Sequence, residues 1–158
     1  MLYRITPHYQ GKTRFCSIFA VIHALMVEFS TRENKEQKIN PWRAVLTVFR
    51  YKNWPFLSNR SFSPHEVVAA FKRYGIKIGD YRWRPQKVVE VAIKDIDGLL
   101  AQGKPIIATL NDSHEVTVVD KMKLWTGVDA YEIIDSSSKK HPYRLLRSPK
   151  LSNFYQII

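Results

Sequence analysis

The sequence contains few of the residues that build specialised classes of protein. Its 158 residues include one cysteine and six glycines. A single cysteine cannot form an intramolecular disulfide, and so few glycines exclude a collagen-like chain. Hydrophobic residues make up 45% of the chain and charged residues 25%, a composition typical of a packed globular protein rather than a disordered one. We therefore expect one domain that spans residues 1–158.

A long hydrophobic run is also absent. Residues 15–27 form the longest apolar stretch, which Ser17 and His23 interrupt, whereas a membrane-spanning helix needs about 20 apolar residues. The sequence therefore predicts no membrane span. The first ten residues contain neither a continuous apolar segment nor a small-residue cleavage site, so no secretory signal is expected. These absences favour a cytoplasmic protein, or one that is delivered to another cell without a signal peptide.

Positive charge is in excess but is unevenly placed. The chain has 25 Lys and Arg residues against 14 Asp and Glu residues, a formal net charge of +11. Residues 90–135 hold nine acidic and four basic residues, so this segment carries −5 and the rest of the chain carries +16. Such a field attracts anionic partners, such as nucleic acid, acidic protein or a membrane surface, without selecting among them.

Two helices are expected in the first third of the chain. Residues 16–29 are apolar on nearly every side and form a run too long for a typical strand, which predicts a helix buried all round, with Cys16 in its first turn. Asn40 followed by Pro41 is typical of a helix cap and a first helical residue, which predicts a helix near residues 42–50.

Two further helices are expected in the middle of the chain. Ser63 and Glu66 have the spacing of a capping box, which predicts a helix that ends at Tyr74, before the stop signal Gly75. A last helical segment is predicted over residues 85–102.

After residue 103 the pattern changes to short runs rich in Ile, Val, Thr and Tyr. Helices first and antiparallel strands afterwards indicate an α+β domain. In this interpretation the N-terminal helices, with the cysteine-bearing helix at their centre, pack on a C-terminal antiparallel β-sheet. Strands are predicted over residues 105–110, 115–119, 130–134, 143–146 and 154–158.

The cysteine is the first candidate for chemistry. A helix N-terminus carries a partial positive charge, which stabilises a thiolate and lowers the pKa of a cysteine placed there. Cys16 is therefore a candidate nucleophile. The alternative is an inert core cysteine, because free cysteine is among the most buried residue types.

Four of the five histidines are poor partners for this thiol. His23 lies seven residues after Cys16 and thus about 10 Å further along the helix axis, too far to reach the sulfur. We interpret it as a core or groove histidine. Local structural or solvent roles are expected for the other three, which are His8, His65 and His141.

The remaining histidine is the candidate base. If residues 114–120 and 129–135 pair as an antiparallel hairpin, positions that sum to 249 face each other, and His114 stands opposite Asp135. A nucleophilic cysteine needs a histidine to hold its proton and a third group to orient that histidine. A plain charged pair at the mouth of a hairpin is the alternative.

An amide donor completes the candidate site. Gln10 lies six residues before Cys16, and an amide NH₂ beside the backbone N–H of a nucleophile stabilises an oxyanion by about 3 to 4 kcal/mol. The chain shows neither the Cys and His spacing of a zinc site nor a glycine-rich phosphate loop, so no metal or other cofactor is expected.

The order Gln10, Cys16, His114, Asp135 resembles the papain-like cysteine peptidase superfamily. In that superfamily Gln precedes Cys at a helix start, His begins a strand, and Asn or Asp ends the next one. Residues 103–136, GKPIIATLNDSHEVTVVDKMKLWTGVDAYEIIDS, also look like the compact branch that includes the peptidases trimming double-glycine leaders from bacteriocins. Similar cores occur in bacterial effector proteases and deamidases.

The resemblance implies a papain-like fold and a cysteine hydrolase that cleaves an amide bond through an acyl-enzyme. Cys16 would attack, His114 would carry the proton, Asp135 would orient His114, and Gln10 would hold the oxyanion. A peptidase, a glutamine deamidase and an acyltransferase all remain open, because one triad serves all three. A protein or peptide substrate is expected, and the basic surface hints that it is acidic. No propeptide precedes Gln10, so zymogen control is not expected.

A second hypothesis is a catalytically inactive basic domain that binds nucleic acid or an acidic protein. Residues 72–87 interleave six basic residues with aromatic ones, a pattern compatible with single-stranded nucleic acid. We favour the alternative of a solvated loop whose aromatic residues pack inward, and nucleic acid is not the favoured partner. The aromatic residues concerned are Tyr74, Tyr81 and Trp83.

Overall fold

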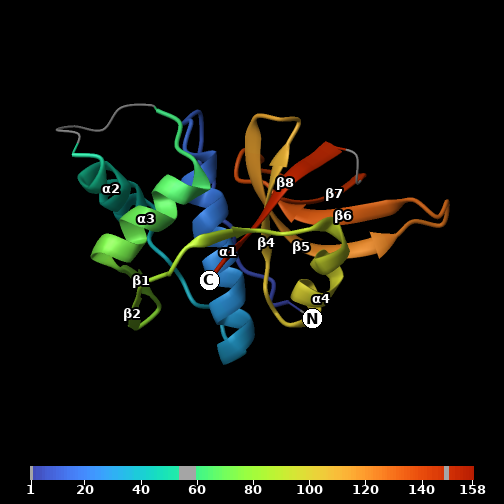
Figure 1. Cartoon of the computed structure of the whole chain (residues 1–158), viewed down its shortest axis with the longest axis horizontal. Coiled ribbons are helices and arrows are strands. Elements are labelled where there is room, and N and C mark those ends of the chain that lie inside the picture. Colours follow the sequence, from blue (N-terminus) through green and yellow to red (C-terminus); the bar gives the residue numbers. More distant parts are fainter. Residues whose placement is uncertain (1, 54–59, 148–149) are drawn as a thin grey trace.

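The helices within residues 16–74 gather on one side of the molecule, and the large β-sheet lies on the other together with the short helix near residue 100 (Figure 1). The computed structural model describes residues 2–53, 60–147 and 150–158. The α+β prediction is confirmed, with the cysteine-bearing helix lying against the sheet. The helical elements described are α1 (Cys16–Glu33), α2 (Pro41–Tyr51), α3 (Pro64–Tyr74), the 3₁₀ turn η1 (Ile93–Asp95) and α4 (Ile96–Ala101).

The strands described form two sheets. A two-stranded hairpin joins β1 (Ile76–Ile78) to β2 (Tyr81–Trp83). The larger sheet has six strands, all antiparallel, in the order β3-β8-β4-β5-β6-β7. Its members are β3 (Val88–Glu90), β4 (Ile106–Leu110), β5 (His114–Lys123), β6 (Asp129–Ile134), β7 (Tyr143–Arg147) and β8 (Leu151–Ile157).

Helix α1 is the buried helix that the sequence predicts. Thirteen of its 18 residues are buried, because it packs against the other helices and against β5. It continues four residues past the predicted end at residue 29. It stops only where Asn34 adopts the left-handed conformation and its N–H donates to the Ser30 carbonyl.

The caps of α2 and α3 are confirmed. The Asn40 side chain accepts hydrogen bonds from the N–H groups of Trp42 and Arg43, with Pro41 as the first helical residue. Ser63 and Glu66 form the reciprocal bonds of a capping box, and the next helix ends at Gly75 as predicted.

The long helix predicted over residues 85–102 is wrong. Only η1 and α4 are helical there, and Val88–Glu90 form a strand that pairs with the C-terminal β8. Its two β-branched residues suit a strand, and a partner some 70 positions away overrides the local helical pattern. The described residues contain no helix long and apolar enough to cross a bilayer.

The segment at residues 72–87 is also not a solvated loop. It contains the end of α3 and the β1–β2 hairpin. Trp83 packs edge-on against Phe29 with ring centroids 5.2 Å apart, in agreement with the prediction that the aromatic residues pack inward. Tyr74 is half-buried, but Tyr81 is 53% exposed, because it stands on the solvent side of the short hairpin.

The predicted hairpin register of β5 and β6 is corrected by the structure. Thr117 pairs with Ile134, two positions from the expected match, and the offset grows by one more residue at a bulge between Val118 and Asp120. The pairing begins at Thr117, so His114 has no directly opposed partner on β6.

Two apolar cores lie on the two faces of the large sheet. The larger packs α1, α2 and α3 against one face, and the smaller lies around α4 on the other. A buried hydrogen bond joins helix to sheet, since the Thr117 hydroxyl on β5 donates to the Ala20 carbonyl on α1 at 2.9 Å. This contact sets the start of α1 beside the start of β5.

Candidate active site

Cys16 is the first residue of α1 and is partly exposed. The residue before it, Phe15, makes no side-chain cap, and the first turn contains no acidic residue. The partial positive charge of the helix N-terminus is therefore not offset by a capping side chain or a carboxylate within the turn. Cys16 also keeps a backbone N–H without an intrahelical acceptor, because it lies in the first turn.

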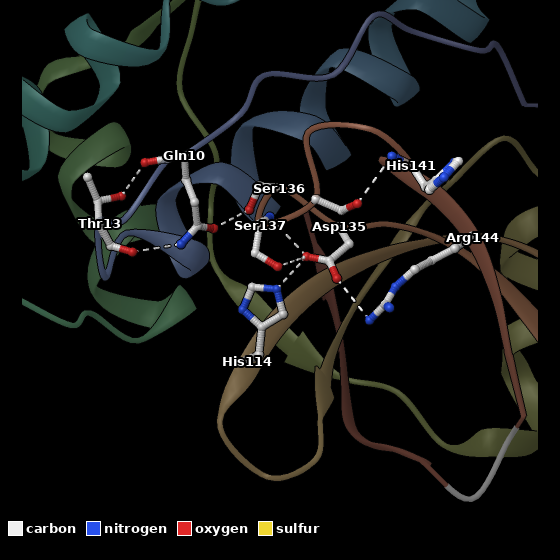
Figure 2. Close-up of polar contacts among 9 residues, drawn as sticks. Gln10, Thr13, His114, Asp135, Ser136, Ser137, His141 and Arg144 are labelled. Atoms are coloured by element: carbon white, nitrogen blue, oxygen red, sulfur yellow. Dashed lines mark hydrogen bonds and ion pairs between the residues drawn. The ribbon is translucent and has the colours of Figure 1, made fainter.

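His114 and Asp135 are in direct contact. His114 is the first residue of β5 and Asp135 follows the last residue of β6, and the imidazole Nε2 lies 2.6 Å from the carboxylate Oδ1 (Figure 2). The predicted partnership is present although the predicted register is wrong. The His114 side chain reaches the Asp135 carboxylate across the register offset between β5 and β6. The backbone N–H of Asp135 instead donates to the Pro142 carbonyl.

The thiol and the imidazole influence each other. Burial raises the pKa of the Cys16 thiol, but hydrogen bonds with the His114 side chain and the Glu115 backbone outweigh it, so the net pKa is lowered. The hydrogen bond to Asp135, followed by that to Cys16, raises the pKa of His114 to about 9. Because Nε2 faces Asp135, the other ring nitrogen, Nδ1, is the one left for the thiol.

Asp135 is held by more than the histidine. Burial raises the pKa of its carboxyl, but hydrogen bonds from His114 and Ser137 lower it well below its usual range. Ser137 donates its N–H and its hydroxyl to Oδ1 at 3.0 and 2.7 Å, and Arg144 of β7 lies 3.0 Å from Oδ2 (Figure 2). The carboxylate is therefore ionised and fixed in orientation.

The roles of Ser137 and Arg144 are not predicted from the sequence. The signal was present, because an Asp followed two residues later by Ser is typical of a side-chain-to-backbone turn. Arg144 carries no such local signal, since only the pairing of β6 with β7 brings it to Asp135.

Gln10 lies beside this cluster and is 8% exposed. Its backbone N–H donates to the Ser136 carbonyl at 2.9 Å, and its side-chain oxygen accepts a hydrogen bond from the Ser136 hydroxyl (Figure 2). Its side-chain nitrogen donates to the Thr13 carbonyl at 2.8 Å, in the loop that leads to Cys16. One NH₂ hydrogen is thus engaged, and the amide joins the cysteine loop to the residue after Asp135.

The other histidines have the structural roles expected. His23 is fully buried, and burial lowers its pKa to about 3. Its Nε2 accepts the backbone N–H of His8 at 2.9 Å. His65 packs edge-on against Tyr155 in the first turn of α3, and His141 is exposed. Within the described ranges, no three His, Cys, Asp or Glu side chains gather as a metal site would require.

Several solved structures that share this arrangement of elements are those of proteases. The proform of Amb a 11, a ragweed pollen allergen, matches with a TM-score of 0.72 over 96% of this chain at 14% identity. Digestive procathepsin L 3 from the larval midgut of Tenebrio molitor gives 0.70 over 90% at 12% identity. The bromelain protease from Ananas comosus, in complex with the E64 inhibitor, gives 0.65 over 90% at 9% identity. The fold is papain-like.

At these identities the papain-like likeness concerns the fold. No family model matches the chain, and no curated protein matches its sequence. The chain spans 62% of the Amb a 11 proform, 61% of the procathepsin and 83% of the bromelain protease. In this chain, the helix that begins at Cys16 lies against the sheet that contains β5, the strand that begins at His114.

Proposed function

We propose that the protein is a papain-like cysteine peptidase that uses Cys16, His114 and Asp135 as its triad. The observation that carries the proposal is the contact of the His114 imidazole with the buried Asp135 carboxylate at 2.6 Å, together with a thiol at the start of α1. The pKa shifts agree with it, because the hydrogen bond with His114 helps to lower the pKa of the Cys16 thiol and the pKa of His114 is raised to about 9. Between those two pKa values the pair is a thiolate and an imidazolium, the reactive form of such a nucleophile.

The proposed reaction proceeds in two steps. The Cys16 thiolate attacks the amide carbon, and the carbonyl electron pair moves to the oxygen. The His114 imidazolium gives its proton to the leaving nitrogen, the C–N bond breaks and a thioester remains. His114, now neutral, takes a proton from water, which attacks the thioester. The C–S bond then breaks, and the thiolate and imidazolium are restored.

Gln10 and the backbone N–H of Cys16 are the proposed donors to the oxyanion. Support comes from the position of Gln10, whose amide binds both Thr13 and Ser136 and is thereby fixed between the cysteine loop and the triad carboxylate. A preorganised donor of this kind stabilises the transition state by about 3 to 4 kcal/mol. The second hydrogen of its NH₂ is the one assigned to this role.

The substrate proposed is a protein or peptide, and an acidic one in view of the net charge of +11. The same triad supports deamidation of a glutamine side chain. The sequence resemblance to bacterial effector deamidases is a second reason to consider that reaction. A peptide backbone is preferred as the target because the folds that match this chain are those of proteases.

Digestion of acidic peptides, read by mass spectrometry, tests the proposal. The parent protein should give two shorter products from one peptide, and Cys16→Ala should give none. The matched control is His141→Ala, which removes an exposed histidine and should keep the parent rate. Products of unchanged length in which Gln has become Glu would assign the deamidase instead. Activity retained in Cys16→Ala would refute both.

A further inference from the structure

A cavity of about 750 Å³ lies on the helical side of the molecule. It is bordered by α2 along its length from Pro41 to Arg50, by the C-terminal end of α3 and by the β1–β2 hairpin. This volume falls within the range of about 300 to 1,000 Å³ that is typical of small-molecule sites. The lining residues include none of the triad, so the cavity is separate from the candidate active site.

The lining of the cavity is strongly cationic. Among the described residues that line it there is no Asp or Glu, and no ion pair recorded for the described part of the chain involves its cations. The positive charges come from two separate segments, residues 38–50 and 77–82, and line one hollow. They belong to Lys38, Arg43, Arg50, Lys77 and Arg82.

Two of these guanidinium groups are held in place by Tyr74. Arg82 donates to the Tyr74 carbonyl at 2.9 Å, and the Arg50 guanidinium lies 4.2 Å from the centroid of the Tyr74 ring. The first contact also covers the partial negative charge at the end of α3, where Arg84 binds the carbonyls of Lys72 and Arg73. The partial negative charge at the end of α3 is therefore already offset by these arginines.

The N-terminal end of α2 adds to the positive field. Asn40 and Pro41 line the cavity, so the aligned peptide dipoles of this 11-residue helix have their positive end there. The five like charges that line the cavity repel one another in the free protein. An anion of matching charge relieves that repulsion.

We propose that this cavity binds a compact molecule that carries several phosphate groups. A phosphate carries about −1.5 to −2 charges near neutral pH, so two or three of them balance the five cations. Guanidinium groups bind phosphate oxygens in a two-pronged geometry, and three of the five cations are arginines. The site is independent of the proposed peptidase activity.

A nucleic-acid strand fits the cavity less well. Binding of a single strand depends on aromatic faces on which bases stack. The face of Tyr74 is already covered by Arg50, and the exposed Tyr81 is not among the lining residues. The cations also line one hollow of limited volume, which suits a compact anion better than a long strand.

Titration calorimetry with inorganic tripolyphosphate tests the proposal. The variant Arg43→Gln/Lys77→Gln removes two exposed cations of the cavity. The matched control, Lys139→Gln/Lys140→Gln, removes the same charge from exposed positions outside it. Thermal melts show whether each variant folds. The parent should bind one tripolyphosphate, the cavity variant should bind about tenfold more weakly or worse, and the control should stay within about twofold.

Three results would overturn the proposal. They are the absence of binding by the parent, an equal loss in both double variants, and an unchanged affinity in the cavity variant. Binding of a thymidine oligonucleotide that the cavity variant loses, without binding of tripolyphosphate, would assign the site to nucleic acid instead.

Vesicle sedimentation distinguishes the two sources of such a ligand, a phosphorylated lipid headgroup and a free solute. Phosphatidylcholine vesicles with and without phosphatidylinositol bisphosphate are sedimented with the parent and the two double variants. Sedimentation that needs the phosphorylated lipid and is lost in the cavity variant identifies a lipid headgroup. Binding of tripolyphosphate without sedimentation identifies a free solute. Either result supports the polyphosphate site.

Discussion

At the scale of single residues, the Asp135 carboxylate governs the site. Its Oδ1 accepts hydrogen bonds from His114 and from both donors of Ser137, and its Oδ2 pairs with Arg144. This carboxylate is 2% exposed and is therefore little screened by water. Its negative charge is the main reason that the pKa of His114 rises to about 9.

Asp135→Asn should bring the pKa of His114 down from about 9 toward the ordinary value of about 6.5. The amide keeps the shape but removes the charge that favours the imidazolium. The measurement is an NMR titration of the His114 ring protons. Asp112→Asn is the control, because it removes an exposed carboxylate at another turn and should leave the titration unchanged. An unmoved midpoint in Asp135→Asn would contradict the role given to the carboxylate.

The raised pKa of His114 also makes the folding stability depend on pH. The pKa of His114 is raised above its unfolded value, so its contribution to folding stability is fully present below about pH 6.5 and is lost as the pH rises through about 9. The thiolate–imidazolium pair has the same upper limit, because it disappears when His114 loses its proton.

At the scale of elements, short-range signals decide where helices begin. The cap of α3 is complete within four residues, from Ser63 to Glu66. Such a signal is readable from the sequence, and both caps predicted are present. The strand β3 is different, because it exists only through pairing with β8 at the far end of the chain, and so a helix is predicted there instead. The bulge in β5 likewise has no local signal, and the hairpin register is missed.

Ser63→Ala should lower the free energy of unfolding by about 1 kcal/mol. The change removes the acceptor for the Glu66 N–H at the start of α3, where the group lacks an intrahelical partner. Urea denaturation measures the difference. Ser61→Ala, at an exposed position outside the helix, should stay within about 0.5 kcal/mol of the parent. Equal losses in the two variants would show that the capping bonds contribute little.

At the scale of the whole molecule, the candidate site depends on how α1 and β5 are joined. Cys16 and His114 are about one hundred positions apart, and each begins the element that carries it. The four candidate site residues could be proposed from their order in the chain and a family resemblance. Their supports, Ser137 and Arg144, could not, because those contacts arise only when the sheet forms. The cationic cavity likewise needs two separated segments, residues 38–50 and 77–82, to come together.

Thr117→Val should test the joint between helix and sheet. The valine keeps the shape but loses the buried hydroxyl that donates to Ala20, which leaves that carbonyl without this partner. We expect the free energy of unfolding to fall by about 1 to 3 kcal/mol, as urea denaturation can measure. Thr117→Ser keeps the hydroxyl and should retain more of the stability than Thr117→Val. The reverse order would show that the hydrogen bond does not hold the two elements together.

The most direct test of the proposed triad is the pH dependence of iodoacetamide alkylation at Cys16, compared between the parent and His114→Ala. The parent should react with a midpoint below the ordinary cysteine pKa of about 8.5, because the imidazole lowers the pKa of the thiol. Removal of His114 should move the midpoint to about 8.5 or above. Burial, which raises the pKa of the thiol, is then opposed only by the hydrogen bond with the Glu115 backbone. The exposed His141→Ala should match the parent. An inert Cys16, or the same midpoint with and without His114, would contradict the triad.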